Sequence, residues 1–186
     1  MDFSAMEQNL RDNILEAQLK LGYSRNAMSF NYMLPTLRHL LHTAAEGADM
    51  AALLEQFAAY VSPRLGSVTF RSIGKGFCIS VPAEGAEFVH ANPDEGAGFL
   101  RALLQTVRQS GATLDDVRAV FRQFSGDAVT EDSPDPEFDL LCYFPSGKPN
   151  AYRFCFTAEE EMDGSMRLSY HRFLKEDYDD FGFGEN

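Results

Sequence analysis

Helical spacing of apolar residues dominates several stretches of the chain. Between Ser4 and Leu21, apolar side chains recur every three or four positions, which predicts an amphipathic helix. Ser4 and Glu7 have the spacing of a capping box, in which each side chain accepts a hydrogen bond from the other residue's backbone amide. Similar spacing predicts further helices over residues 35–45, 49–60, 93–107 and 113–124. The sequence therefore predicts about five helices.

A two-residue alternation replaces the helical period between residues 67 and 82. Val68 and Phe70 alternate with polar neighbours, and the intervening Gly74-Lys75-Gly76 allows the positive φ values of a tight turn. These residues predict a β-hairpin. Two shorter segments are less regular: residues 26–33 fit either a short strand or an extended arm, and residues 87–90 fit a short strand.

Alternation returns after a polar, proline-containing segment at residues 128–136, which predicts a loop. Residues 137–173 then predict a meander of three antiparallel strands. Directly opposed residues share a sheet face, so we expect Phe154 to lie opposite Cys142 and Tyr152 opposite Phe144. This register gathers the aromatic side chains on one face of the sheet.

The order of these elements indicates the fold class. Helices and strands are grouped along the chain instead of alternating, which favours an α+β fold over a doubly wound parallel sheet. We expect an antiparallel sheet of about five strands, formed by the hairpin at 67–82 and the meander at 137–173 and packed on one face by about five helices. A single domain is expected over residues 1–174, followed by an acidic, disordered tail at 175–186.

Charge narrows the classes of partner. The 186 residues carry a formal charge of −12, and three stretches (127–139, 159–163 and 175–185) hold 15 of the 28 acidic residues. An acidic protein lacks the excess of lysine and arginine that neutralises phosphates, so we expect no nucleic-acid partner and no anionic membrane surface. The body of the protein is close to neutral, and the acids belong to loops and the tail.

Cysteine usage and hydropathy indicate the compartment. Cys78, Cys142 and Cys155 have no metal-binding spacing, and an odd number cannot pair completely, which is typical of a reduced intracellular protein. The N-terminus does not have the pattern of a signal peptide, and no apolar run reaches the roughly 20 residues of a spanning helix. We therefore expect a cytoplasmic protein.

The sequence has no recognisable catalytic or cofactor motif. It contains neither the Gly-x-Ser-x-Gly elbow of hydrolases nor a glycine-rich phosphate loop, and His39-x-x-His42 lacks the further ligands of a metal site. We expect no cofactor and no metal. One alternative stays open: Cys155 and His171 fall on the same predicted sheet face, which would suit a small hydrolase or transferase.

The polar face of the predicted sheet is the strongest candidate for a binding site. Alternation places Arg71, Arg153, Arg167 and His171 opposite the aromatic side, together with Tyr143. In the expected register Arg153 lies across from Tyr143, where its guanidinium can stack on the ring. These five residues are the candidate ligand-binding set for a carboxylate, a phosphate or an acidic peptide. Alternatively, this face is simply solvated, or the chain's own acidic loop or tail neutralises the arginines.

The N-terminal quarter resembles a known family. Leu21-Gly22-Tyr23, Tyr32-Met33-Leu34-Pro35 and Leu40-Leu41 are similar to the opening of an uncharacterised family of intracellular proteins from gut clostridia. The resemblance implies a bacterial cytoplasmic protein and brings no catalytic residue. We therefore expect a non-enzymatic module that binds a protein partner or a small anionic ligand. A structural, oligomer-forming protein is a further alternative, with Phe30, Tyr32 and Met33 as its apolar patch.

Overall fold

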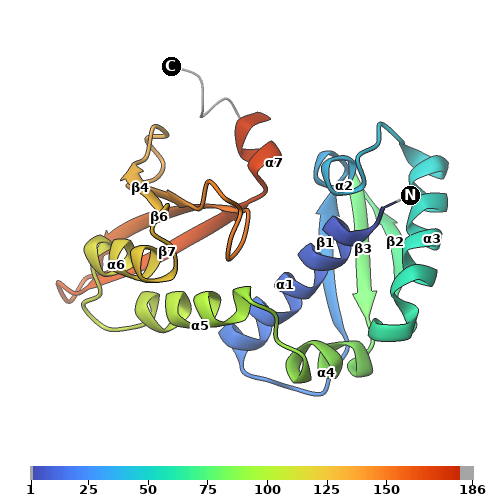
Figure 1. Ribbon diagram of the computed structural model, residues 1–186, viewed down its shortest axis with the longest axis horizontal. Coiled ribbons are helices and arrows are strands. Elements are labelled where there is room, and N and C mark those ends of the chain that lie inside the picture. The colour runs from blue at the N-terminus through green and yellow to red at the C-terminus, as the bar shows by residue number, and fades with distance from the viewer. Residues whose placement is uncertain (1, 181–186) are drawn as a thin grey trace. The chain divides into compact units, whose positions relative to one another are not determined.

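The computed structural model describes residues 2–180, which divide between Pro93 and Asp94 into two compact units (Figure 1). We call these the first unit and the second unit. Each has its own antiparallel sheet and its own helices, so the α+β class is confirmed. The expectation of one sheet of about five strands is wrong, because the strands form one sheet of three and another of four. The single domain over 1–174 stays a prediction.

The first unit combines four helices with a three-stranded sheet of order β1-β3-β2. Its elements are α1 (Ser4–Leu21), β1 (Met28–Met33), α2 (Leu34–Leu41), α3 (Gly47–Leu65), β2 (Thr69–Ile73), β3 (Gly76–Val81) and α4 (Ala83–Ala91). The hairpin predicted at 67–82 is confirmed as β2 and β3, with Gly74 in its turn at a φ of 49°. Residues 28–33 are a strand and not an extended arm.

Strand β1 is joined to strand β3 by close backbone contact and to helix α1 by a tyrosine. The Tyr32 hydroxyl donates to Asn9 Oδ1 of α1 at 3.0 Å and accepts from Asn13 Nδ2 at 2.8 Å, which sets this face of the sheet against α1. Gly76 faces Met33 across the pair. A Cβ atom at position 76 would lie 2.0 Å from the Tyr32 carbonyl oxygen, so only glycine lets the two backbones approach this closely.

Two local predictions in the first unit are wrong. Ser4 is the first helical residue of α1, and its amide donates to Asp2 Oδ1 at 2.9 Å, while Glu7 pairs with Arg64 instead of completing a capping box. Residues 87–90 belong to helix α4 and not to a strand. The buried Ala86 and Val89 lie three positions apart on α4, and this helical spacing prevails over the short alternation at its end.

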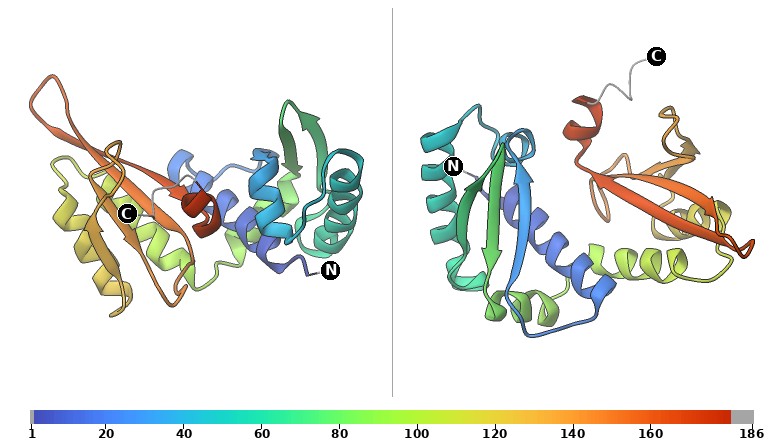
Figure 2. Two further views of the ribbon diagram at one scale, coloured as in Figure 1. Left: turned by 90° about the horizontal axis from the view of Figure 1, so that it is seen from above. Right: turned by 180° about the vertical axis from the view of Figure 1, so that it is seen from behind.

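The second unit combines three helices with a four-stranded sheet of order β4-β5-β6-β7 (Figure 2). Its elements are α5 (Gly96–Val107), α6 (Leu114–Phe124), β4 (Val129–Asp132), β5 (Leu140–Tyr143), β6 (Arg153–Glu160), β7 (Met166–Phe173) and α7 (Lys175–Asp180). Thr113 caps α6 through a complete capping box with Asp116. The long β6–β7 hairpin runs directly into α7 (Figure 1).

The predicted register of the meander is confirmed. Cys142 lies opposite Phe154, and Tyr143 lies opposite Arg153. Phe154 and its alternate neighbours are fully buried against α5 and α6, where the rings of Phe99 and Phe121 lie within 5.7 Å of the Phe154 ring. Alternation therefore sorts the side chains as expected, with aromatic residues on the inner face that packs against these helices.

Two polar segments are ordered where the sequence predicts a loop and a tail. Residues 129–132 form the edge strand β4, which pairs with β5. Residues 175–180 form helix α7, on which Tyr178 is only 3% exposed. The expected disorder therefore does not hold for these first six tail residues, because Tyr178 finds a buried position on the sheet. The rest of the predicted tail, 181–186, lies outside the described residues.

Candidate functional site

The candidate site lies on the face of the second sheet that points away from α5 and α6. We call it the outer face of the second sheet. Two rows of directly opposed residues cross it: Tyr143–Arg153–Phe173 and Leu141–Cys155–His171. Further along the β6–β7 hairpin, Glu159 lies opposite Arg167. Four of the five candidate residues, namely Tyr143, Arg153, Arg167 and His171, therefore share one face as predicted.

Arg153 and Tyr143 form the centre of this site. The guanidinium carbon of Arg153 lies 3.9 Å from the centroid of the Tyr143 ring, which is the stacked pair that the register predicts. Both side chains are half-buried. Within residues 2–180 no carboxylate forms an ion pair with Arg153, although the chain carries 28 acidic residues. The guanidinium therefore keeps its hydrogen-bond donors available.

Helix α7 covers part of the outer face. Tyr178 is buried together with Leu141 and Cys155, and Phe138, Tyr143 and Phe173 pack around these three residues. The ring centroids of Phe173 and Tyr178 are 6.1 Å apart. Because the Tyr143 ring also carries Arg153, the stacked arginine lies at the edge of the same apolar cluster.

Two acidic residues, Asp135 and Glu131, act electrostatically on the hydroxyl group of Tyr178. Burial raises the pKa of the Tyr178 hydroxyl to about 12, and Cys155, Asp135 and Glu131 act in the same direction, whereas the charge of Arg153 opposes it. Asp135 is 3% exposed, and its Oδ1 accepts a hydrogen bond from the Glu137 amide at 2.9 Å. Its Oδ2 is buried and accepts no hydrogen bond from any described residue. An unpartnered buried carboxylate oxygen is costly for the folded state.

The alternative site, Cys155 with His171, is assembled in space but lacks the chemistry of a nucleophile. The two residues are direct cross-strand partners. Cys155 is fully buried, and burial, followed by the charge of Asp135, raises its thiol pKa to about 12. A catalytic cysteine needs a lowered pKa, since the thiolate is the attacking species. His171 is exposed, and its ring lies edge-on to Phe138 at 5.6 Å.

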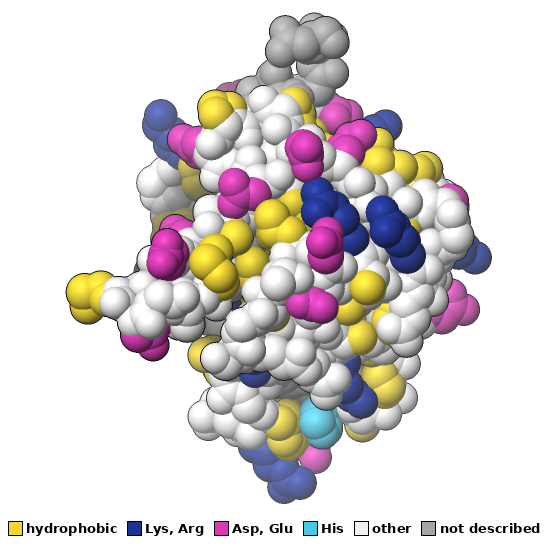
Figure 3. All heavy atoms as spheres, turned by 90° about the vertical axis from the view of Figure 1, so that its left-hand side faces the viewer, with side chains coloured by type: hydrophobic (Ala, Val, Ile, Leu, Met, Phe, Trp, Pro, Cys, Tyr) yellow, Lys and Arg dark blue, Asp and Glu magenta, His cyan; other side chains and the backbone are white. Residues whose placement is uncertain are grey.

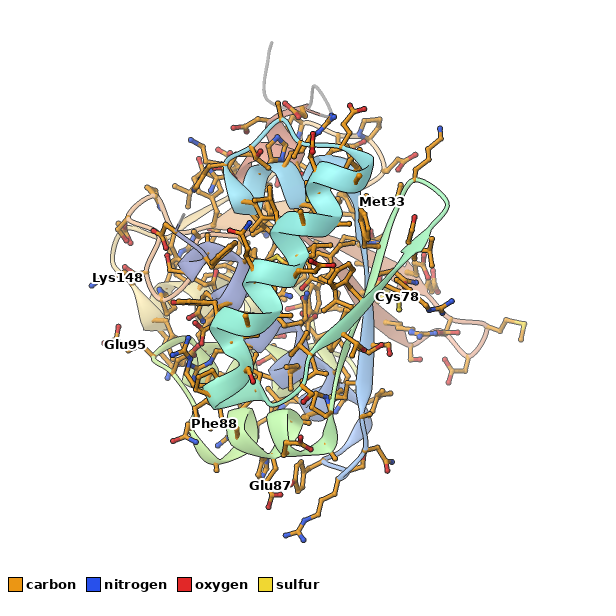
Figure 4. All side chains as sticks on the ribbon, turned by 90° about the vertical axis from the view of Figure 1, so that its right-hand side faces the viewer. Met33, Cys78, Glu87, Phe88, Glu95 and Lys148 are labelled. Atoms are coloured by element: carbon orange, nitrogen blue, oxygen red, sulfur yellow. The ribbon has the colours of Figure 1, made fainter. Side chains whose placement is uncertain are left out.

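The two remaining candidate arginines have different surroundings. Arg167 lies 3.5 Å from Glu161, so the chain's acidic loop pairs with this arginine, as one of the predicted alternatives had it. Arg71 is on β2 of the first sheet, opposite Cys78 of the middle strand β3, which Figure 4 labels together with Met33 of β1. The prediction that Arg71 shares a sheet with Arg153 and Arg167 is wrong, because alternation determines a face and not the neighbouring strands.

Asp135, Phe138, Phe173 and Tyr178 are site residues that sequence reasoning missed. Tyr178 carries the one available signal, since an aromatic residue in an acidic run marks a candidate anchor. Asp135 lies between Pro134 and Pro136 in a segment whose composition predicts a solvated loop. Its burial depends on packing between distant segments, which no local pattern reveals.

The described residues hold neither a cluster of metal ligands nor a helix suited to spanning a membrane. Within the described residues, no group of three or more His, Cys, Asp or Glu side chains is arranged to hold a metal ion. His39 lies in the last turn of α2, and His42 follows as its C-cap. Over the same part of the chain, no helix combines the length and the apolar character needed to cross a membrane. On the side seen in Figure 3, hydrophobic side chains show between acidic and basic ones.

The fold and site define an α+β protein with two antiparallel sheets and a stacked arginine on the outer face of the second. The chain belongs to the family DUF3877, described as a domain of unknown function from an E. rectale gene. The match spans residues 3–182, so the family extends over nearly the whole chain and not only the N-terminal quarter that carries the resemblance. No curated protein and no solved structure matches the chain.

Proposed function

We propose that the protein is a non-enzymatic binding module whose outer face on the second sheet recognises a carboxylate through Arg153 and Tyr143. The observation that carries the proposal is the half-buried Arg153 guanidinium, stacked on Tyr143 at 3.9 Å and without a carboxylate partner in residues 2–180. A planar guanidinium held by a ring presents its donors in a fixed direction, which suits the two oxygens of a carboxylate. The ligand is a small carboxylate or a carboxylate on a partner protein.

The bacterial cytoplasm is the proposed compartment. All three cysteines are free thiols in the structure, which supports a reducing environment. The formal charge of −12 supports the proposal that neither nucleic acid nor an anionic membrane is the partner.

A titration with succinate tests the carboxylate site in the full chain. Nuclear magnetic resonance of the arginine Nε–Hε groups reports on Arg153 directly. One or two charge-assisted hydrogen bonds at a half-exposed site correspond to an affinity of about 1–10 mM. We expect succinate to shift the Arg153 signal in this range, and Arg153→Gln to remove the binding.

Arg167→Gln is the matched control, because Arg167 lies on the same face but already pairs with Glu161. It should leave succinate binding unchanged within about twofold. Succinate binding of equal strength in wild type and Arg153→Gln, or equal losses in the two variants, would show that the stacked arginine is not the recognition group.

A further inference from the structure

Helix α7 buries an aromatic residue on the outer face of the second sheet. Its sequence, Lys175–Asp180, places Tyr178 among four acidic residues, and Tyr178 is the residue that it buries. The backbone amide of Tyr178 donates to the Leu174 carbonyl at 3.0 Å, so the helix continues directly from the end of β7. α7 is thus an acidic segment with one aromatic anchor.

We call the position of the Tyr178 side chain on the outer face, beside Leu141 and Cys155, its seat. This seat adjoins the proposed carboxylate site. Tyr178 packs with Leu141 and Cys155, and its ring lies 6.1 Å from that of Phe173, the cross-strand partner of Arg153. Tyr143, which carries the Arg153 guanidinium, packs against the same cluster. An acidic segment whose aromatic side chain occupies this position therefore lies near a cation that has no ion pair in the described chain.

Helix α7 buries few of its side chains. Tyr178 is buried, and the other five residues of 175–180 are exposed or half-buried. Segments attached by few buried side chains open with a small free energy compared with global unfolding. α7 therefore combines the features of a ligand with those of an element that opens readily.

We propose that the ligand of this site is an acidic segment with an aromatic anchor, similar to residues 176–180, and that α7 occupies the site in the free protein as an intramolecular competitor. The inference rests on the proposed function, since Arg153 is the group that would receive the ligand's carboxylates. Helical segments commonly bind grooves through one or two apolar anchors and are selected by flanking charges. A tethered segment competes with a high effective concentration, so a ligand that carries an aromatic anchor binds with that anchor only when α7 is open.

The probe is a fluorescein-labelled peptide of residues 174–180, and fluorescence anisotropy measures its affinity for the full chain. Tyr178→Ala removes the anchor of α7 but leaves its seat intact. We expect this variant to bind the peptide at least about tenfold more tightly than wild type, because an α7 that is closed more than about 90% of the time lowers the apparent affinity by that factor. Tyr178→Leu keeps a smaller apolar anchor and should fall between wild type and Tyr178→Ala.

Two controls separate the anchor from general effects. Tyr23→Ala makes the same chemical change at a tyrosine of the first unit and should leave peptide affinity unchanged. A peptide with alanine in place of its tyrosine should not bind any variant. The inference is overturned if Tyr178→Ala and Tyr178→Leu, both folded by circular dichroism, bind the peptide no better than wild type.

Alkylation of Cys155 tests the inference without any substitution. Cys155 is fully buried beside Tyr178, so iodoacetamide reaches it through opening of the structure, and peptide mapping distinguishes it from Cys78 and Cys142. If the peptide captures the open state, excess peptide slows alkylation of Cys155 in wild type by several-fold. The alanine peptide should leave the rate unchanged. An equal rate with and without the tyrosine peptide contradicts the inference.

A second substitution distinguishes this inference from the proposed function. In the Tyr178→Ala chain, adding Arg153→Gln should weaken peptide binding by about tenfold, as expected for a charge-assisted hydrogen bond. If the peptide binds Tyr178→Ala tightly but Arg153→Gln has no effect, the anchor seat stands and carboxylate recognition by Arg153 fails. If succinate binding depends on Arg153 but removal of the anchor does nothing, the proposed function stands and competition by α7 fails.

Discussion

The outer faces of the two sheets follow the same alternation but differ in what covers them. On the first sheet, Cys78 of the middle strand lies between Asn31 and Arg71, both exposed to solvent. On the second sheet, Cys155 lies between Leu141 and His171, and Tyr178 of α7 packs over it. On the first face the two residues beside Cys78 are exposed although Cys78 itself is buried, whereas on the second face an aromatic cluster packs around Cys155.

The arginines on the two outer faces differ in how strongly their side chains are held in place. Arg71 is exposed on its strand, whereas Arg153 is half-buried and held in one direction by the Tyr143 ring. A side chain that is already ordered loses less conformational entropy on binding. The candidate site is therefore the second outer face, although the sequence places an arginine on both.

The largest expected difference in the free energy of unfolding is between the variants Cys155→Glu and Cys78→Glu, which place a carboxylate on the outer face of each sheet. Cys155→Glu introduces a charge at a fully buried position near the buried Asp135, so it should lower the free energy of unfolding by more than about 3 kcal/mol. Cys78 is also buried, at 4% exposed, but its neighbours Asn31 and Arg71 are exposed, so the Cys78→Glu carboxylate can extend to solvent beside Arg71 and should cost about 1 kcal/mol. Urea unfolding of the two variants measures the difference, and equal costs would show that the two faces are equally open.

Alkaline pH should weaken the covered face. Burial raises the pKa of the Cys155 thiol and the Tyr178 hydroxyl to about 12, from 9.0 and 10.0. Their contribution is fully present below pH 9, and it is lost as pH rises to about 12, because the unfolded chain releases these protons first. The free energy of unfolding should fall by about 1.4 kcal/mol per pH unit for each group.

Urea unfolding as a function of pH measures this slope. Cys155→Ala should make the slope between pH 9 and 12 shallower by the contribution of one proton. A slope identical to that of wild type would mean that the thiol is not kept protonated by burial.

Helix capping gives a smaller contrast between the two units. In the second unit, Thr113 Oγ1 accepts from the Asp116 amide at 3.3 Å, while the Thr113 amide donates to Asp116 Oδ2 at 2.8 Å. Thr113→Ala should lower the free energy of unfolding by about 1 kcal/mol. Ser4→Ala in the first unit should cost less than about 0.5 kcal/mol, because Ser4 lies inside α1 and does not cap it. A larger cost for Ser4→Ala would place a working capping box at the start of α1.

The stacked pair should give the smallest measurable effect. A double-mutant cycle with Arg153→Gln and Tyr143→Ala isolates their interaction, which we expect to be about 0.5–1 kcal/mol. Arg71→Gln, at an exposed position of the first sheet, should change the free energy of unfolding by less than about 0.5 kcal/mol. A coupling energy near zero would mean that the ring orients the guanidinium without stabilising the fold.

Local patterns predicted the parts of the fold that depend on nearest neighbours. The even-numbered apolar residues of β5 and β6 determined their register, since a slip by one residue would expose Phe154 to water. The hairpin of β2 and β3 followed from its glycine turn. The stacking of Arg153 on Tyr143 could be predicted because it follows from that register alone.

Features that depend on distant segments could not be predicted. Residues 129–132 end in two acidic residues and precede two prolines, yet they form an edge strand, a position where charged side chains are common. The division into two sheets depends on which strands pair, and the alternation within a strand does not specify its partner. The burial of Asp135 and Tyr178 likewise arises only when the loop before β5 and the helix after β7 meet on the sheet.

The contact between Gly76 and the Tyr32 carbonyl has a consequence for variation in the first unit. An alanine methyl group would stand 2.0 Å from that oxygen, so even the mildest replacement must push β1 away from the central strand. β1 carries Tyr32, whose hydroxyl bonds to Asn9 and Asn13, so the displacement would reach α1 as well. The absence of a side chain at position 76 therefore sets the distance between β1 and β3, and through Tyr32 it also affects how α1 packs on the sheet.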